Sequence, residues 1–430
     1  MGTKINKQLK RKSKKTLKTY KNKVHKSKRN RVNRRLFNKT LKGGSYNNIV
    51  NINGNKTSKH TNTVFRTSFN LNGTLVVTSS ADHTCKIWNV SSGECLRTLT
   101  GHVKSVYSAS FSPNGEFIVS ASADLTCKIW NVSSGECLRT LNEHIKPVYS
   151  ASFSPNGEFI VSASEDNTCK IWNVSSGECL QTLEGHNNTV YSASFSPNEK
   201  NEKFIVSASA DRTCKIWDVD SGECLQTLEG DEEDEGHEGH DDTVYSASFS
   251  PNGKLIVSAS EDGTCKIWDV NSGKCINTLE GHTDDVNCAS FNADGTMIVS
   301  GSTDKTFRVW NAENGECIMT KHNNNNNVEY VAFNPNPNVL ESLDLVNISL
   351  CASHLTSSTK ALSHNHNHNH SKHVSYNQNN TNPFSAYYTS NNLVSDMNYF
   401  LGDLPIFITT FGNHFKLWNK QTLCENESQI

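Results

Sequence analysis

Hydrophobic and polar residues alternate in short runs along most of this chain, and the same pattern returns many times. Its clearest unit starts at Val106, where an alternating run reaches Ser112 and meets Pro-Asn-Gly, a tripeptide that favours a tight turn. Residues 117–122 form a second run, rich in β-branched and aromatic residues, and residues 127–130 form a third. A Ser-Ser-Gly turn leads into a fourth run over residues 137–141. The pattern predicts four short antiparallel strands in each unit.

The unit is a true internal repeat. A near-copy starts at Val148, and its first 17 residues are identical to those that start at Val106. The third run of each copy ends at a tryptophan, and successive tryptophans are 42, 42, 45, 51, 42 and 108 residues apart. A repeat of this length with four strands predicts a propeller, because one small sheet cannot bury both faces, whereas sheets stacked in a closed ring can. The seven tryptophans are Trp88, Trp130, Trp172, Trp217, Trp268, Trp310 and Trp418.

Other residue types recur at fixed distances from these tryptophans. In the second copy, Gly101-His102 precedes the first run, Asp124 follows the second, and Asn131 follows the tryptophan. From about residue 46 to residue 430 the chain resembles the WD-repeat β-propeller family in these positions. The resemblance implies an all-β fold, a seven-bladed β-propeller of four-stranded antiparallel blades with a degenerate seventh blade.

In that family the His, Asp, Trp and a strand Ser or Thr of each repeat form a hydrogen-bonded network inside the blade. We expect the same structural role here, because a buried polar group without a partner costs about 1–3 kcal/mol and the four residues should depend on one another. A catalytic Ser–His–Asp site would need one activated copy, and six equivalent copies argue against it. The expected members are His60, Thr78, Asp82 and Trp88; His102, Ser120, Asp124 and Trp130; His144, Ser162, Asp166 and Trp172; His186, Ser207, Asp211 and Trp217; His240, Ser258, Asp262 and Trp268; and His282, Ser300, Asp304 and Trp310.

The last unit departs from the pattern. Trp418 remains, but Gly412 stands where the Asp is expected and Ile408 where the hydroxyl residue is expected. A low-complexity insertion from about 335 to 399 precedes it and carries alternate histidines over residues 364–370; tracts of this composition are more often flexible than metal-binding, so no metal site is predicted. In the family an N-terminal strand commonly closes the ring, and residues near 48–54 are expected to do so here.

The near-zero net charge conceals a basic arm attached to an acidic body. Residues 1–42 contain 18 Lys or Arg and no Asp or Glu, whereas the remainder contains 24 basic and 43 acidic residues. Such charge density predicts a disordered arm over residues 1–44, and the propeller domain is assigned to residues 45–430. The arm is interpreted as a nuclear or nucleolar address, a nucleic-acid tether or a solvated tail. The residues singled out are Lys10, Arg11, Lys12, Lys14, Lys15, Lys28, Arg29, Arg31, Arg34 and Arg35.

Fourteen cysteines would suggest disulfides in a secreted chain, but without a recognisable signal peptide we expect a reducing location, cytosolic or nuclear. Five occupy one repeated slot before the tryptophan and most others follow the Ser-Gly turn, so we expect reduced, small core residues. Without a Cys-x-x-Cys motif a zinc site is not expected, and no run approaches the 18 apolar residues of a membrane span.

Function has to be argued from the surface, since the chain carries no phosphate-binding loop and no nucleophile elbow. We expect no enzyme activity, no cofactor and no small-molecule substrate. In the family, partners commonly meet the top face near the central channel, and the start of each inner strand lies there. Tyrosine suits a binding surface, although near-identical repeats could equally have copied one packing Tyr. The candidates are Phe65, Tyr107, Tyr149, Tyr191 and Tyr245, with Glu165 and Glu261 beside them in the turns.

Two functions follow from these features. The first is a non-catalytic protein-interaction scaffold that binds a peptide or protein on the top face, where the two glutamates would favour basic ligands. The alternative is a nucleic-acid-associated propeller, tethered by residues 1–42 in a ribonucleoprotein or chromatin assembly. A ubiquitin-ligase substrate receptor is disfavoured, because the Arg that adaptor-binding propellers often carry two positions after the Trp-Asp dipeptide is missing.

Overall fold

The computed structural model describes residues 59–197, 204–229, 239–323, 326–335, 407–411 and 414–418. These residues form strands and turns and no helix, which confirms the all-β class. The chain divides into two units, residues 1–49 and 50–430, and every described residue belongs to the second. The basic arm, the expected closing strand near 48–54 and almost all of the low-complexity insertion lie outside the described residues.

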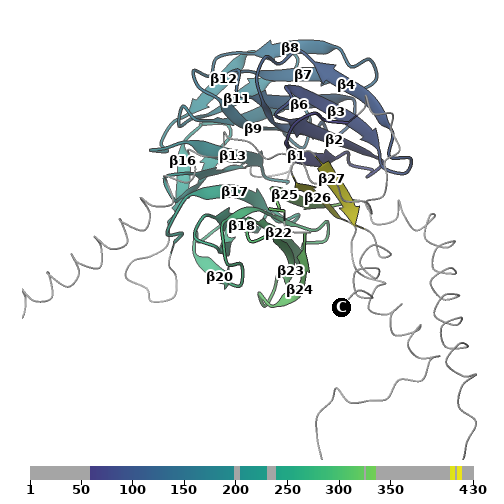
Figure 1. Cartoon of the computed structure of the whole chain (residues 1–430). Coiled ribbons are helices and arrows are strands. Elements are labelled where there is room, and N and C mark those ends of the chain that lie inside the picture. Colours follow the sequence, from purple (N-terminus) through teal and green to yellow (C-terminus); the bar gives the residue numbers. More distant parts are fainter. Residues whose placement is uncertain are drawn as a thin grey trace, which may run out of the picture. The chain divides into compact units, whose positions relative to one another are not determined.

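The described strands form six four-stranded sheets and one three-stranded sheet, each in simple sequence order (Figure 1). The first three sheets are β1–β4 (Val64–Phe69, Leu75–Ser80, Thr84–Asn89, Cys95–Thr100), β5–β8 (Val106–Phe111, Phe117–Ser122, Cys127–Asn131, Cys137–Leu141) and β9–β12 (Val148–Phe153, Phe159–Ser164, Cys169–Asn173, Cys179–Leu183). The next three are β13–β16 (Val190–Phe195, Phe204–Ser209, Cys214–Asp218, Cys224–Leu228), β17–β20 (Val244–Phe249, Leu255–Ser260, Cys265–Asp269, Cys275–Leu279) and β21–β24 (Val286–Phe291, Met297–Ser302, Thr306–Asn311, Cys317–His322). The last sheet is β25–β27 (Tyr330–Phe333, Phe407–Phe411, His414–Trp418).

The six four-stranded sheets are the blades of a propeller ring, numbered here in chain order. Their first strands contact one another in the order β1, β5, β9, β13, β17 and β21, and β25 contacts both β21 and β1. The hydrophobic core lies between neighbouring blades rather than inside one: Trp130 of the second blade packs in one cluster with Val77 and Ile87 of the first. Each sheet therefore buries its faces against the next, as the repeat length predicts.

The repeated Tyr-Ser-Ala-Ser sequence of the inner strands links neighbouring blades by hydrogen bonds. The N–H of Ala151 donates to Ser108 Oγ at 3.2 Å, and Ser110 Oγ donates to the Ala151 carbonyl at 3.0 Å. The third and fourth blades repeat both contacts: the N–H of Ala193 donates to Ser150 Oγ at 3.1 Å, and Ser152 Oγ donates to the Ala193 carbonyl at 3.2 Å. Small hydroxyl residues suit this position because they let adjacent strands approach closely and satisfy backbone groups that no ladder pairs.

At the outer rim, a long side chain of one blade lies against the turn of the next. Arg97 donates from Nε and Nη2 to the Ser133 carbonyl at 3.2 and 3.0 Å. The turn continues to Gly135, whose φ of 77° is strained for a residue with a Cβ. A Cβ there would lie 3.5 Å from Cδ of Arg97, so the glycine is required by its backbone conformation more than by space.

The interface between the sixth blade and the three-stranded sheet differs in side-chain volume from the copied ones. Between the second and third blades, Ala121 and Ala151 belong to one core cluster. At the same positions the interface with the three-stranded sheet has Gly301 and Val331, and a Cβ on Gly301 would lie 2.7 Å from Val328 Cγ1 and 3.2 Å from Val331 Cγ1. A smaller residue on the sixth blade thus faces a larger one on the last sheet, and Phe307 takes the place of the repeated cysteine.

The interface between the three-stranded sheet and the first blade carries contacts that the described copies lack. The Arg66 guanidinium lies 5.0 Å from the centroid of the Tyr330 ring, a cation–π geometry. Asn334 donates from Nδ2 to the Gly73 carbonyl at 3.4 Å. Arg66, Tyr330 and Asn334 stand where the second and third blades have serine, so the contact between the first and last sheets is chemically distinct.

The register of the three-stranded sheet corrects one expectation. In the second blade Ser120 pairs with Lys128, and in the last sheet the equivalent pair is Thr409 and Lys416, not Ile408. The hairpin between β26 and β27 is one residue shorter than in the copies, which shifts the hydroxyl slot by one position. Thr409 is fully buried, so a hydroxyl residue does occupy this slot.

The close contact of Gly301 with the three-stranded sheet predicts that a larger residue there would destabilise the protein by overpacking. We expect Gly301→Ala to lower the free energy of unfolding by about 1–3 kcal/mol, because the added methyl meets the Val328 and Val331 side chains in a close-packed core. The double variant Gly301→Ala with Val331→Ala recreates the alanine pair of the copied interfaces and should recover part of that loss. Urea denaturation of the full-length variants measures both.

The comparison with Val331→Ala alone decides the cause. If the loss of stability in the double variant equals the sum of the losses in the two single variants, the two side chains do not compete for the same space and the volume argument is wrong.

Candidate partner-binding face

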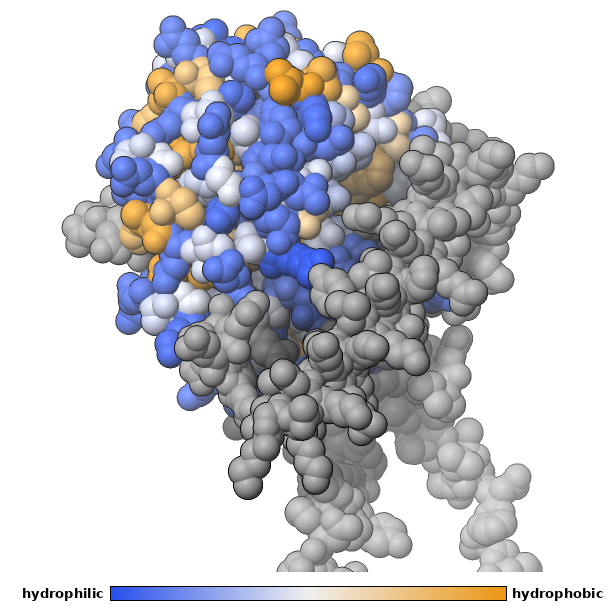
Figure 2. Space-filling view, turned by 90° about the vertical axis from the view of Figure 1, so that its left-hand side faces the viewer, coloured by the Kyte–Doolittle hydropathy of each residue, from blue (hydrophilic) through white to orange (hydrophobic). Residues whose placement is uncertain are grey.

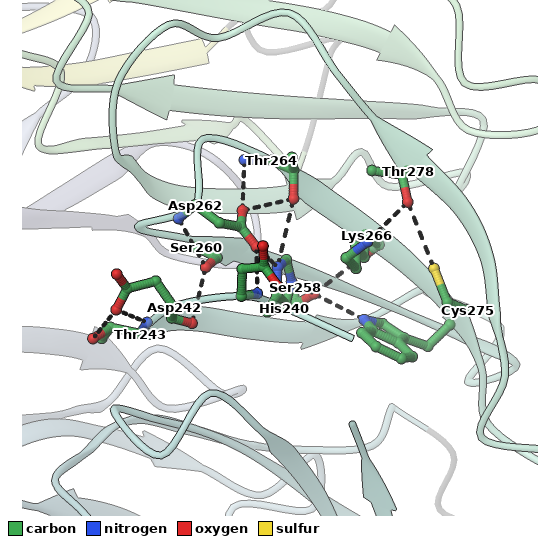
Figure 3. Close-up of polar contacts among 12 residues, drawn as sticks. His240, Asp242, Thr243, Ser258, Ser260, Asp262, Thr264, Lys266, Cys275 and Thr278 are labelled. Atoms are coloured by element: carbon green, nitrogen blue, oxygen red, sulfur yellow. Dashed lines mark hydrogen bonds and ion pairs between the residues drawn. The ribbon is translucent and has the colours of Figure 1, made fainter. Parts of the chain in front are cut away.

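Each described blade contains a buried network of four side chains, shown for the fifth blade in Figure 3. His240 Nδ1 lies 2.7 Å from Asp262 Oδ2, and its Nε2 lies 2.6 Å from Ser258 Oγ. Trp268 Nε1 donates to the same hydroxyl at 2.8 Å. An ionised carboxylate only accepts, so Nδ1 carries the proton, Nε2 accepts from Ser258, and the hydroxyl accepts from the indole.

The same arrangement recurs in all six four-stranded blades. The His Nδ1 to Asp Oδ2 distance is 2.7–2.8 Å in every copy. The structure thus brings together every member of the network that the sequence pattern named, with Thr78 in the hydroxyl position of the first blade. The three-stranded sheet differs. The histidine that precedes it, His322, ends β24 and is exposed rather than buried.

This geometry resembles a hydrolytic triad but does not present a nucleophile. Ser258 is 0 % exposed, and its hydroxyl is bonded to the imidazole and the indole at once. A nucleophilic oxygen has to reach a substrate carbonyl, and nothing larger than a hydrogen-bond partner can approach this one. Since the other five copies share the arrangement, the network supports the blade rather than a reaction.

In the fifth blade the network favours the ionised form of Asp262, and burial favours the neutral form of His240. For Asp262, burial acts to raise the pKa, but hydrogen bonds from His240 and Thr264 and the charge of the imidazole lower it to about 2. The pKa of His240 is lowered, chiefly by burial, although the bond to Asp262 opposes this. Asp262 also accepts from the backbone N–H of Asp241 at 3.1 Å, so the carboxylate ties the loop after the histidine to the turn between the second and third strands.

That tie defines one end of the ring, which we call the top face. It consists of the loops that follow each network His, the turns that contain each network Asp, and the starts of the inner strands. In the second blade the N–H of Val103 donates to Asp124 Oδ2 at 3.1 Å, directly before β5 starts at Val106. The buried network therefore positions the loops of the top face.

The five aromatic candidates form one continuous row at this end. The centroid of Phe65 lies 5.3 Å from that of Tyr107, which stacks on Tyr149 at 4.9 Å with 22° between the ring planes. Tyr149 meets Tyr191 at 4.9 Å, and Tyr191 meets Tyr245 at 5.3 Å. We call these five rings the aromatic arc. Contacts of this kind hold the rings in place, so the arc is a preformed surface.

The two glutamate candidates lie close to the arc. The Tyr245 hydroxyl donates to Glu261 Oε2 at 2.8 Å. Burial and the negative charge of Glu165 raise the pKa of Tyr107. Beyond Tyr245 the circle continues with Asn287, which donates from Nδ2 to the Val328 carbonyl at 2.9 Å rather than stacking. The structure thus places the predicted aromatic and acidic residues together on one face.

Two apolar residues of this face were not singled out in the sequence. Val103 and Ile145 are 73 % and 78 % exposed, and each directly follows a network His. The signal was present, because the other blades carry Thr, Asn or Asp at this slot. The blades are otherwise near-copies of one another, so this slot is one of the positions at which their sequences differ.

The outer rim also exposes apolar residues, but singly. The second residue of each outer strand is exposed, one per blade, and Figure 2 shows apolar residues on one side of the molecule as separate patches in a mostly hydrophilic surface. Scattered residues of this kind are normal on soluble proteins. They are Leu96, Leu138, Leu180, Leu225, Ile276 and Ile318.

The cysteines fall into two groups, and only one matches the expectation. Those in the slot before the tryptophan, such as Cys127, are buried, and burial raises the pKa of the Cys127 thiol. Those after the glycine turn lie on outer strands, where Cys137, Cys224 and Cys317 are exposed and are not core residues, whereas Cys275 is buried. All described cysteines are free thiols.

Other candidate features stay untested or are absent within the described ranges. The basic residues of the arm and the histidines at 364–370 lie outside the described residues. Among the residues that the structure does describe, there is no cluster of three or more metal-binding side chains. The same part of the chain has no helix long and apolar enough to cross a membrane.

Comparison with known families agrees with this geometry. The family model described as "WD domain, G-beta repeat" matches residues 54–89, 93–131, 135–173, 177–218, 222–269 and 273–311, together more than half of the chain. The chain belongs to the WD-repeat family. Each matched segment from residue 93 onward joins the outer strand of one sheet to three strands of the next, so each of these five WD repeats spans two neighbouring blades.

Similarity to individual curated relatives is short. A protein named "Ribosome biogenesis protein BOP1 homolog" from Drosophila grimshawi is 50 % identical over 44 residues, which is 10 % of this chain and 6 % of that protein. The homologue from Drosophila erecta is 48 % identical over 44 residues, with the same coverage. The chain thus matches only a small fraction of these relatives, about the length of one repeat.

The shared hydroxyl predicts strong coupling within the network. We expect Ser258→Ala to lower the free energy of unfolding by about 1–3 kcal/mol, since it leaves His240 Nε2 and Trp268 Nε1 buried without a partner. Combined with His240→Phe, the loss should fall short of the sum by about 0.5–3 kcal/mol, as double-mutant cycles of contacting residues do. Thermal unfolding followed by circular dichroism measures the cycle. Ser133→Ala, in an exposed turn, is the control and should change stability by less than about 0.5 kcal/mol; strict additivity at residues 240 and 258 would contradict the network.

The ionisation states predict a loss of stability in acid. The Asp262 pKa is lowered from 3.8 to about 2 on folding, so its contribution is fully present above pH 3.8 and is lost as pH falls towards 2. Below pH 6.5 the unfolded chain also binds a proton that buried His240 resists, which acts in the same direction. The unfolding temperature should therefore fall between pH 6.5 and pH 2, and Asp262→Asn should flatten the lower part of that curve. An unfolding temperature that rises on acidification would show that the signs are wrong.

Proposed function

We propose that this WD-repeat protein is a non-catalytic interaction scaffold that binds a peptide or protein partner through the aromatic arc of its top face. The observation that carries the proposal is the contact of five rings in one row, from Phe65 to Tyr245. Rigid aromatic rings give a large contact area with little loss of conformational entropy, which is why Tyr is frequent in binding hot spots.

The chemistry beside the arc supports a partner with basic groups. Glu261 lies within hydrogen-bond distance of Tyr245, and Glu165 places negative charge near Tyr107. A Lys or Arg side chain at this surface would meet both the carboxylates and the faces of the rings, an arrangement that favours cations. The non-catalytic part of the proposal is supported by the buried hydroxyls of the networks, because they offer no nucleophile to a substrate.

The alternative function is a nucleic-acid-associated propeller tethered by residues 1–42. Its support is the 18 basic residues of that segment, together with the short similarity to proteins named for ribosome biogenesis. Neutralising several phosphates releases counterions and makes affinity strongly salt-dependent. The same observations support a nuclear or nucleolar location. We rank it second because the similarity spans only 44 residues, a length that the repeat pattern itself accounts for.

We further propose that the three-stranded sheet is a degenerate seventh WD blade. Its support is the contact of β25 with both β21 and β1, the buried Thr409 in the hydroxyl slot, and the pairing of Arg66 with Tyr330. Closure of the ring by a strand near 48–54 stays a prediction; the start of the first WD match at residue 54, ahead of His60, is consistent with it.

Affinity purification tests the scaffold against the nucleic-acid tether. Tagged full-length protein is compared with a variant carrying Tyr149→Asn and Tyr191→Asn, and with one in which the ten singled-out arm residues become Gln. The sixth blade carries Asn287 at the tyrosine position, so the blade accepts asparagine there. We expect the Tyr variant to lose its associated proteins about tenfold or more, and nuclease treatment and the arm variant to leave them unchanged.

Equal unfolding temperatures of the three proteins serve as the control for folding. If the associated proteins disappear with nuclease and with the arm variant but remain on the Tyr variant, the tether is the function and the scaffold proposal fails.

A further inference from the structure

The loops after the network histidines divide the top face into two chemically opposite halves. In the second and third blades these loops read Val103-Lys104 and Ile145-Lys146, and all four residues are exposed. The fifth blade carries Asp241 and Asp242 at these two positions, and the sixth carries Thr283 and Asp284, followed by Asp285. The fourth blade, which lies between the two pairs, carries Asn at residues 187 and 188.

The apolar half lies beside the two rings of the aromatic arc that stack on each other. Tyr107 and Tyr149 belong to the same two blades as Val103 and Ile145, and they are the pair with nearly parallel rings. Exposing Val103 and Ile145 at 73 % and 78 % leaves apolar surface in water that the polar residues of the other blades avoid. An apolar group of a partner would remove that surface from water.

The acidic half lies on the other side of the ring. The inner strands of the fifth and sixth blades, β17 and β21, contact each other and are separated from β5 and β9 by β13 in one direction and by β25 and β1 in the other. Asp284 is exposed, and Glu261 reaches the last ring of the arc through the Tyr245 hydroxyl. Negative charge thus continues from the loops to the aromatic row.

We infer that the top face binds an extended peptide in one orientation, with an apolar side chain over Val103 and Ile145 and Lys or Arg residues over the acidic loops of the fifth and sixth blades. This inference rests on the proposed scaffold function and names its partner chemistry. The arc runs from one half to the other, so a strand-like segment crossing the mouth of the ring contacts rings along its length.

The opposite orientation is disfavoured by charge. Lys104 and Lys146 follow directly after the two apolar residues, so a basic segment placed there meets like charge. Specificity of this kind needs both an attractive and a repulsive element, and the two halves of the face supply them.

Fluorescence anisotropy with the full-length protein tests the inference. The probe is a labelled peptide with two leucines at one end, a Gly-Ser spacer, and four Lys or Arg residues at the other. The comparison peptide has the same composition with the basic residues distributed evenly. We expect the polarised probe to bind about tenfold more tightly, with an affinity that falls as salt is raised.

The chain itself supplies substitutions that the blades accept. Val103→Thr and Ile145→Thr introduce the residue found at this slot in the first and sixth blades, and Asp241→Asn with Asp242→Asn copies the fourth blade. Each pair should weaken the probe by about fivefold or more, and only the aspartate pair should reduce the salt dependence. Leu71→Pro is the control: it removes an apolar residue that is 70 % exposed in the turn between β1 and β2, where the second, third and fifth blades carry proline.

The outcomes separate this inference from the proposed function. Equal binding of the two peptides, or threonine variants as tight as the wild type, overturns the polarised orientation. If Tyr149→Asn with Tyr191→Asn still abolishes binding of partner proteins in that case, the scaffold function stands without it. If that tyrosine variant leaves both the probe and the partner proteins bound, the arc is not the site and both proposals fail.

Discussion

The structure depends on one constraint: a four-stranded sheet has two faces and can bury neither alone. Trp130 therefore packs on residues of the preceding blade, and the core of every blade belongs half to its neighbour. The WD repeat spans two sheets for the same reason, since an outer strand and the next three strands are joined in one matched segment. Stability, ring order and the position of the top-face loops all follow from contacts between blades rather than within them.

The His–Ser–Asp–Trp network connects this packed core to the loops of the top face. Its carboxylate is bound from inside the blade by the imidazole and from outside by a loop N–H, as Asp124 is by His102 and Val103. The loop residue after the histidine can then vary without loss of the scaffold, because its backbone rather than its side chain makes the contact. This separation explains how Val103 and Asp241 occupy equivalent positions in blades that are otherwise near-copies.

Near-identical repeats do not by themselves specify the order of the blades, since any two copied blades could pack against each other equally well. The chain departs from its own pattern at the two interfaces of the three-stranded sheet. Gly301 faces Val331 where the copies pair alanines, and Arg66 faces Tyr330 where the copies have serine. A volume exchange at one interface and a cation–π pair at the other distinguish these contacts from all others that the structure describes, so the ends of the repeat array are chemically unique.

The repeat period, the turn residues and the fixed spacing of His, Asp and Trp were enough to predict the strands, the blades and the membership of the network. Local sequence carries these features because each depends on a pattern within about one repeat length. It could not place Thr409 in the hydroxyl slot, since the shorter hairpin appears only in the strand register. Nor could it separate core cysteines from exposed ones, because the two groups differ in which strand faces solvent. The stacking of Tyr107 on Tyr149 and the division of the top face into apolar and acidic halves arise only when ring closure brings separate repeats to one end.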